Sequence, residues 1–300
     1  MQNLLNSARE QLKNGEPAML VSILSSDGSS PRGRGAMMLC GPKGLLCGSV
    51  GGGALEARCL ELAAADLAEG VSCVREFTLG SASAELPQML CGGKVTLAFI
   101  CLSEDPARWT AQLEEACKAL EAGQDARLDL GEEAGILTIP ALPRVYVFGG
   151  GHCAFALVPI LARTGFRVTL VDDRSAYADA ARFPGAETVI CGPYGQTAAQ
   201  LPIGEKDYIV VMTSGHEHDF EVLEQVLRKD FVYLGCMGSR AKAAALRTKL
   251  LAAGFSDADV DRVKTPIGLS IGSETPEEIA VSIAAELIAV RAAKRKEAGL

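Results

Sequence analysis

The residues best suited to chemistry form a glycine-rich turn, Gly149–Gly151, followed directly by His152 and Cys153. An apolar run precedes the turn, and an apolar stretch with helical spacing follows it. With Ala154 the turn matches the G-x-G-x-x-A form of a dinucleotide fingerprint, in which small residues let the backbone approach a pyrophosphate. Backbone N–H groups in the first turn of such a helix attract anions. We therefore expect a phosphate cradle made by Gly149, Gly150, Gly151, His152 and Cys153.

A second group of charged residues follows the next apolar run and consists of Asp172, Asp173 and Arg174. Asp172 lies 21 residues past Gly151, where a carboxylate binds a ribose in dinucleotide-binding folds. The Arg174 guanidinium could instead accept a 2′-phosphate or another phosphate group. We expect all three residues to contact the ligand. The alternative is a structural glycine turn in a doubly wound fold that no longer binds anything.

Thr213 and His216 follow a further apolar run and would lie at the carboxyl edge of a parallel sheet, where ligands bind. We expect both to contact the ligand. The run His216–Asp219 resembles a metal motif, but ligands at i and i+2 converge only in a loop, and no further histidine pattern supports them. We predict no metal site, and we expect Asp219 to cap a helix over residues 220–228.

The elements that must position these residues divide the chain into two domains. Residues 1–139 mix helices and short strands without regular alternation, which indicates an α+β domain. Pro140–Pro143 is the expected linker, because its two prolines exclude a helix. Residues 144–300 alternate apolar strands with helices, which predicts an α/β fold with a doubly wound, Rossmann-type parallel sheet.

The composition excludes several classes of protein. The 300 residues carry a net charge of −8, with 48% hydrophobic and 22% charged residues, which is typical of a globular protein. The negative charge argues against nucleic-acid and anionic-membrane partners. There is no apolar run of the ~18 residues that a membrane span needs and no signal-peptide pattern at the N-terminus. We therefore expect a cytoplasmic protein whose ten cysteines are reduced.

Motifs along nearly the whole chain resemble those of the xanthine dehydrogenase accessory family (XdhC/CoxI). They are Ser29–Arg32, Gly48–Glu56, Cys91–Gly93, Gly149–His152, Val171–Arg174, Thr213–Asp219, Tyr233–Gly235, Gly238–Arg240, Pro266–Gly268 and Gly272–Glu278. The chain departs from the family at Cys236, where an apolar residue is usual, and at Ser214, where an arginine is common.

The resemblance implies an accessory protein and not a catalyst. Such proteins hold the molybdenum cofactor, support its sulfuration together with a cysteine desulfurase, and deliver it to a molybdenum hydroxylase of the xanthine dehydrogenase or aldehyde oxidase type. The ligand would be a pterin that carries a phosphate, sometimes extended by a nucleotide, and the protein would be a homodimer.

The resemblance also draws attention to candidate sites in the N-terminal half. Gly52 and Gly53 could form a second anion nest, or could serve close packing of a helix on a strand. Ser30 and Arg32 could donate to an oxyanion or a pterin ring, or form a plain polar turn. Cys91 could bind molybdenum or carry sulfur as a thiolate, or be a small buried residue.

Cys153 is a weaker thiol candidate, in a first turn where the helix dipole favours a thiolate. Two other functions stay open. An NAD(P)-dependent oxidoreductase would use the same cradle, although no acid–base pair beyond His152 and His216 is evident. A nucleotide-sensing regulatory module would change its dimer shape with a dinucleotide.

Overall fold

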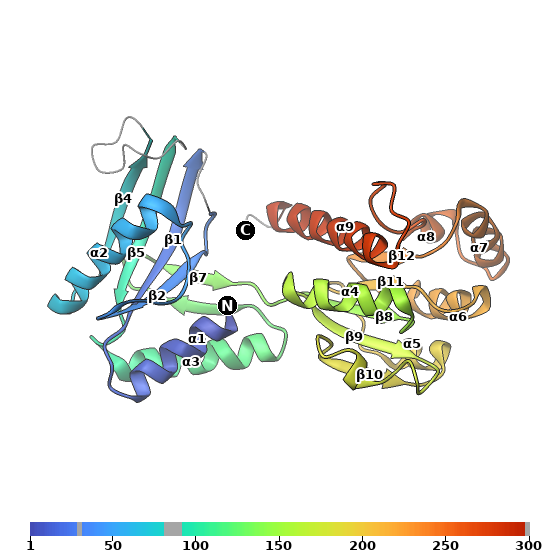
Figure 1. Cartoon of the computed structure of the whole chain (residues 1–300), viewed down its shortest axis with the longest axis horizontal. Helices are drawn as coiled ribbons and strands as arrows, with labels where there is room; N and C mark the ends of the chain where they lie inside the picture. The colour runs from blue at the N-terminus through green and yellow to red at the C-terminus, as the bar shows by residue number, and fades with distance from the viewer. Residues whose placement is uncertain (29–31, 81–91, 298–300) are drawn as a thin grey trace. The chain divides into compact units, whose positions relative to one another are not determined.

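The computed structural model describes residues 1–28, 32–80 and 92–297. The chain divides into two compact units, Met1–Ala141 and Leu142–Leu300, which are described separately. Figure 1 labels most of the elements of both units. Among the helices that the structure describes, none has the length and apolar character needed to span a bilayer.

The first unit is built on a five-stranded antiparallel sheet with the strand order β3-β2-β1-β5-β4. Its strands are β1 (Met19–Gly28), β2 (Met37–Gly41), β3 (Gly44–Gly48), β4 (Cys73–Leu79) and β5 (Gly93–Cys101). The remaining elements are α1 (Gln2–Lys13), α2 (Gly53–Glu69), α3 (Pro106–Glu121) and the hairpin of β6 (Ala126–Asp129) and β7 (Ile136–Ile139).

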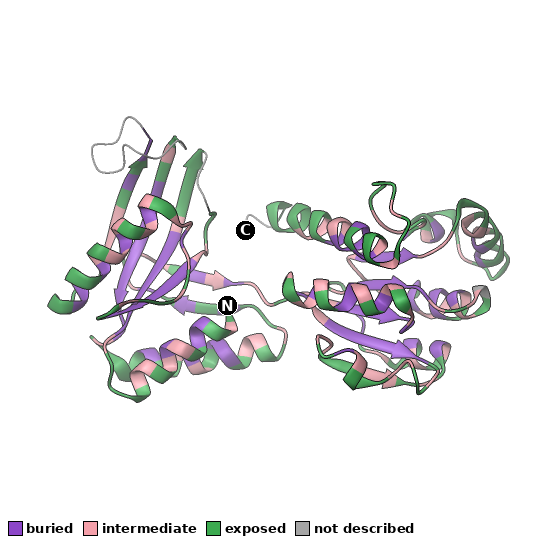
Figure 2. Cartoon of the chain, in the orientation of Figure 1, coloured by how far each residue is buried: buried purple, intermediate pink, exposed green. Residues whose placement is uncertain are grey.

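Both faces of this sheet are covered, and strand β1 shows why. Leu20 packs into a core with helices α1 and α3, whereas Val21 and Ile23 pack into a core with helix α2. Successive side chains of a strand point to opposite faces, so an unbroken apolar run supplies both cores. Figure 2 shows the buried residues gathered along these strands.

The second unit is a six-stranded parallel sheet with the strand order β10-β9-β8-β11-β12-β13. Its strands are β8 (Arg144–Phe148), β9 (Arg167–Asp172), β10 (Thr188–Cys191), β11 (Tyr208–Val211), β12 (Tyr233–Cys236) and β13 (Val263–Lys264). Helices α4 (His152–Arg163) and α9 (Pro276–Glu297) cover one face. The other face carries α5 (Tyr194–Gln200), α6 (His216–Val226), α7 (Arg240–Ala252) and α8 (Asp257–Asp261).

The predicted doubly wound parallel sheet is confirmed, and alternation along β8 produces its two layers. Val145 and Val147 pack towards α4 and α9, while Tyr146 and Phe148 pack towards α5 and α6. The sequence pattern missed strand β13, because two residues are too few to show any periodicity.

Candidate functional site

The glycine turn lies where the strand order of the second unit reverses, beside its first strand β8. Strand β8 is flanked by β9 and β11, so the crossovers leave it in opposite directions. The loops that follow β8 and β11 touch: a Cβ on Gly149 would lie 2.3 Å from the Met212 carbonyl oxygen, and Gly149 has φ +110°. In open α/β sheets ligands bind outside the carboxyl ends of the strands at this point.

Gly150 is required by the packing of the protein itself. A Cβ there would lie 2.5 Å from the Tyr177 carbonyl oxygen. Its N–H donates to Asp172 Oδ2 at 2.7 Å. The first two glycines of the motif therefore have structural roles that need no ligand.

Gly151 differs, because neither conformation nor packing against the described residues requires a glycine. Its φ is −71°, and a Cβ built on it would meet no heavy atom within 4 Å. It is the N-cap of α4, and no side chain caps the helix. The first turn of α4 thus combines uncapped backbone donors with open space above them, which suits an anionic ligand.

The side chains that follow the turn contribute unequally. His152 is exposed at the first position of α4, and Cys153 is half-buried beside it. Burial raises the pKa of the Cys153 thiol. This opposes the thiolate that the helix dipole was expected to favour.

Asp172, which is predicted to contact a ribose, bonds to groups of the protein in this structure. Its side chain is fully buried. Oδ1 accepts from the N–H and Nε of Arg174, at 3.0 and 2.9 Å, and Oδ2 accepts from Gly150 N and Arg174 Nη2, at 2.7 and 2.9 Å. Burial alone would raise the pKa of this carboxyl, but the donors from Arg174 and Gly150 outweigh it and lower the pKa to about 2. Asp173 is more exposed and lies 3.6 Å from Arg174 Nε.

Thr213 also bonds to another side chain of the protein. Its hydroxyl donates to Asp219 Oδ1 at 2.6 Å, and its N–H donates to the same oxygen at 3.2 Å. Asp219 is fully buried, and its second oxygen pairs with the Lys242 ammonium from α7. The prediction that Asp219 caps a helix is wrong: α6 begins at His216 with Gly215 as N-cap, and Asp219 fastens the preceding loop from inside the helix.

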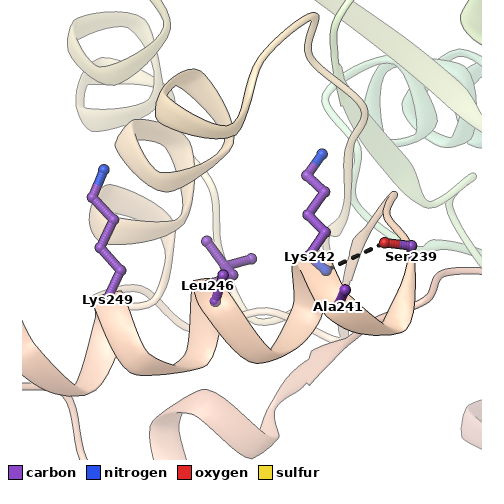
Figure 3. A pocket seen from close by; sticks show the side chains of 6 residues that line it. Ser239, Ala241, Lys242, Leu246 and Lys249 are labelled. Atoms are coloured by element: carbon purple, nitrogen blue, oxygen red, sulfur yellow. Dashed lines mark hydrogen bonds between the residues drawn. The ribbon is translucent and has the colours of Figure 1, made fainter.

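A cavity of about 480 Å³ lies along the side of α7 that carries Lys242. Figure 3 shows Lys242 and Lys249 extending from the same side of this helix, with Ser239 at its start. Lys249 Nζ lies 4.3 Å from the centre of the Phe220 ring on α6. Both ammonium groups thus contact side chains of α6.

The second glycine triplet is filled by the protein's own carboxylate. Gly51, Gly52 and Gly53 have φ values of +136°, +72° and +59°. Glu56 Oε2 accepts from Ser49 Oγ at 2.6 Å and from the N–H groups of Val50 and Gly52 at 3.2 Å. These donors, the Ser49 hydroxyl above all, lower the pKa of Glu56. In this structure the carboxylate of Glu56 thus takes the Gly52 N–H that the predicted anion nest would offer.

The remaining candidates from the sequence are Ser30, Arg32, Cys91 and His216. Ser30 and Cys91 lie outside the described residues, so their predicted roles stay predictions. Arg32 is exposed in the segment between β1 and β2. His216 begins helix α6. Among residues 1–28, 32–80 and 92–297, no three His, Cys, Asp or Glu side chains group to hold a metal ion.

Sequence reasoning missed the partners that occupy the predicted donors and acceptors. Glu56 follows its triplet by three residues, and this spacing was a readable signal. Lys242 carried no such signal, because its pairing with Asp219 joins two different helices, α6 and α7, that come together only in the folded protein. The role of Tyr177 next to Gly150 likewise depends on the folded loop.

Two family models match this chain and together cover most of it. One is described as the XdhC Rossmann domain and matches residues 145–287; the other is described as the XdhC and CoxI family and matches residues 11–78. A two-unit protein with a Rossmann-type second unit is thus defined by both fold and sequence. The chain belongs to the XdhC and CoxI family.

Several known proteins are similar over almost the whole chain. A probable xanthine dehydrogenase subunit from Bacillus subtilis is 27% identical, over 93% of this chain and 95% of that protein. The molybdenum cofactor insertion chaperone PaoD of Escherichia coli is 25% identical, over 96% and 88%. A crystal structure described as a xanthine dehydrogenase from Bacillus halodurans shares the fold, with a TM-score of 0.79, 24% identity, and coverage of 95% and 96%.

The chain spans 46% of the length of another relative, the uncharacterized Escherichia coli protein YqeB, to which it is 24% identical.

Proposed function

We propose that this protein binds the molybdenum cofactor as cargo and supports its insertion into a hydroxylase of the xanthine dehydrogenase type. The observation that carries the proposal is the first turn of α4, where backbone donors without a side-chain cap face open space at Gly151. This turn would hold the phosphate of the pterin. The names of the relatives from Bacillus subtilis and Escherichia coli support this assignment.

The side chains around the turn favour holding a ligand over transforming it. Asp172 and Thr213 direct their polar atoms into the protein, and His152 is the exposed titratable group on the turn itself. A general acid–base mechanism needs a positioned group whose pKa suits proton transfer. A chaperone needs binding and release, which backbone donors supply without chemistry.

The finer parts of the assignment belong to the same proposal. The protein would act in the cytoplasm as a homodimer, with a cysteine desulfurase supplying sulfur and a molybdenum hydroxylase receiving the cofactor. Cys91 would be the thiol that carries sulfur or contacts molybdenum. Arg32 and Ser30 would donate to an oxyanion or to a pterin ring.

The test is retention of molybdopterin by the purified protein and by the variant Gly151→Asp. A carboxylate at this position would face the phosphate, so we expect affinity to fall by about tenfold or more through charge repulsion and loss of space. Gly204→Asp is the matched control, since it adds the same charge to the loop before β11, at the amino-terminal ends of the parallel strands and not at the carboxyl ends where α4 begins.

Fluorescence of the pterin released after oxidation measures retention in all three proteins. We expect wild type and Gly204→Asp to retain it equally. Unchanged affinity in Gly151→Asp would contradict a phosphate site at the first turn of α4.

A further inference from the structure

The Asp172 carboxylate has no acceptor capacity left for a ligand. An ionised carboxylate offers about four lone-pair directions. In this structure Asp172 accepts four hydrogen bonds, one from Gly150 N and three from the backbone and guanidinium of Arg174. The side chain is also fully buried. A ribose diol could reach it only if the Arg174 guanidinium, which binds both carboxylate oxygens like a fork, moved away.

The Arg174 fork is held in place by the segment that follows it. The guanidinium carbon lies 3.8 Å from the centre of the Tyr177 ring, a cation–π contact. The N–H groups of Tyr177 and Ala178 donate to the Arg174 carbonyl oxygen, both at 2.9 Å. The Tyr177 carbonyl in turn packs over Gly150. Arg174 is thus part of a folded turn that closes over the end of β9.

We propose that Arg174 is a specificity-determining residue that closes the ribose-binding carboxylate of this Rossmann unit to nicotinamide dinucleotides. A bidentate guanidinium–carboxylate pair is charge-assisted, and the neutral hydroxyl groups of a ribose do not compete with it. The crevice then accepts a ligand through its phosphate at the α4 turn and not through a nucleoside diol at β9. This inference deepens the proposed function and rests on it, because it takes the first turn of α4 as the site that binds the phosphate of the ligand.

The decisive experiment is a gain of binding, which a misfolded variant cannot mimic. Wild type and Arg174→Ala are titrated with NADH, and the change in NADH fluorescence gives the dissociation constant. Removing the fork exposes two carboxylate oxygens to the ribose diol, so we expect Arg174→Ala to bind NADH about tenfold or more tightly than wild type. Arg174→Gln, which lacks the charged fork but retains an amide donor for Asp172, should show a smaller gain.

A matched control and a second ligand separate this effect from general loosening. Arg182→Ala removes an equal charge beside the same Tyr177 ring, where Arg182 lies 4.9 Å from the ring centre, and Arg182 bonds Ala176 O. It should bind NADH as wild type does. NADPH should gain nothing in Arg174→Ala, because the uncovered carboxylate would face the 2′-phosphate.

Three results would overturn the inference: wild type that binds NADH as tightly as Arg174→Ala, both Arg174 variants without gain, or an equal gain for NADPH. Molybdopterin retention, measured on the same proteins, tests the proposed function separately. Wild type that fails to retain molybdopterin, while Arg174→Ala gains NADH binding, would remove the proposed function and leave the role of Arg174 intact.

Discussion

At the scale of single residues, two carboxylates show how a glycine-rich turn satisfies its backbone donors. Glu56 fills the turn that precedes α2, and Asp172 takes the Gly150 N–H of the turn that precedes α4. Both carboxyls have lowered pKa values because N–H and O–H donors stabilise their charged forms. The two turns differ at Gly151, because Asp172 bonds Gly150 N and no side chain caps the helix that begins after Gly151.

The charge of Asp172 should stabilise the fold in a pH-dependent way. Lowering its pKa from 3.8 to about 2, at about 1.4 kcal/mol for each pKa unit, corresponds to about 2 kcal/mol of free energy of unfolding. Because the folded pKa is the lower one, this contribution is complete above about pH 4 and is lost as the pH falls towards 2.

Asp172→Asn should therefore lower the free energy of unfolding at pH 7 by about 2–3 kcal/mol, since it leaves the Arg174 fork unpaired. Urea denaturation at several pH values measures the gap between variant and wild type, which should narrow below about pH 4. Asp173→Asn is the control at an exposed neighbour and should cost less than about 1 kcal/mol. A gap that stays constant down to pH 2 would contradict the role given to the Asp172 charge.

At the scale of elements, the loop after β11 depends on helices α6 and α7. Asp219 on α6 bonds Thr213, and Lys242 on α7 compensates the buried charge of Asp219. Lys242→Met would leave that charge buried without a counterion, a change that costs ~3–5 kcal/mol in proteins. We expect a loss of this size in the free energy of unfolding.

Lys249→Met provides the comparison, because it removes an ammonium from the same side of the same helix. Lys249 is exposed and contacts the Phe220 ring, so its loss should cost about 1 kcal/mol or less. Chemical denaturation of both variants measures the difference. Equal losses would show that the Asp219–Lys242 pair has no special role.

The sequence predicted the elements well where an apolar pattern extends over several residues. Strand β8, helix α4 and strand β9 follow from apolar runs and a glycine turn, and the structure confirms the sheet they form. The start of α6 was misplaced by four residues, because Asp219 is a residue type that often caps helices. Its actual acceptor role needs Lys242, which only the folded protein brings near.

At the scale of the whole molecule, each unit has its own cores on both faces of its own sheet. Each unit also contains a glycine triplet that leads into a helix, and the sequence favoured Gly149–Gly151 while leaving the role of Gly52 and Gly53 open. The triplet at Gly51–Gly53 needs glycine for its positive φ values and already holds Glu56. At Gly151 the structure gives no such reason, and we therefore propose the Gly149–Gly151 triplet as the ligand site.

The most direct measurement compares both turns in one experiment, a titration of ¹⁵N-labelled protein with inorganic pyrophosphate observed by NMR. A phosphate bound at the first turn of α4 should shift the amide resonances of Gly151, His152 and Cys153 saturably. The amides of Gly51 and Gly52 should stay in place, because Ser49 Oγ and the Glu56 carboxylate accept from them. Saturable shifts at Gly51 and Gly52, with none at Gly151, would contradict the account.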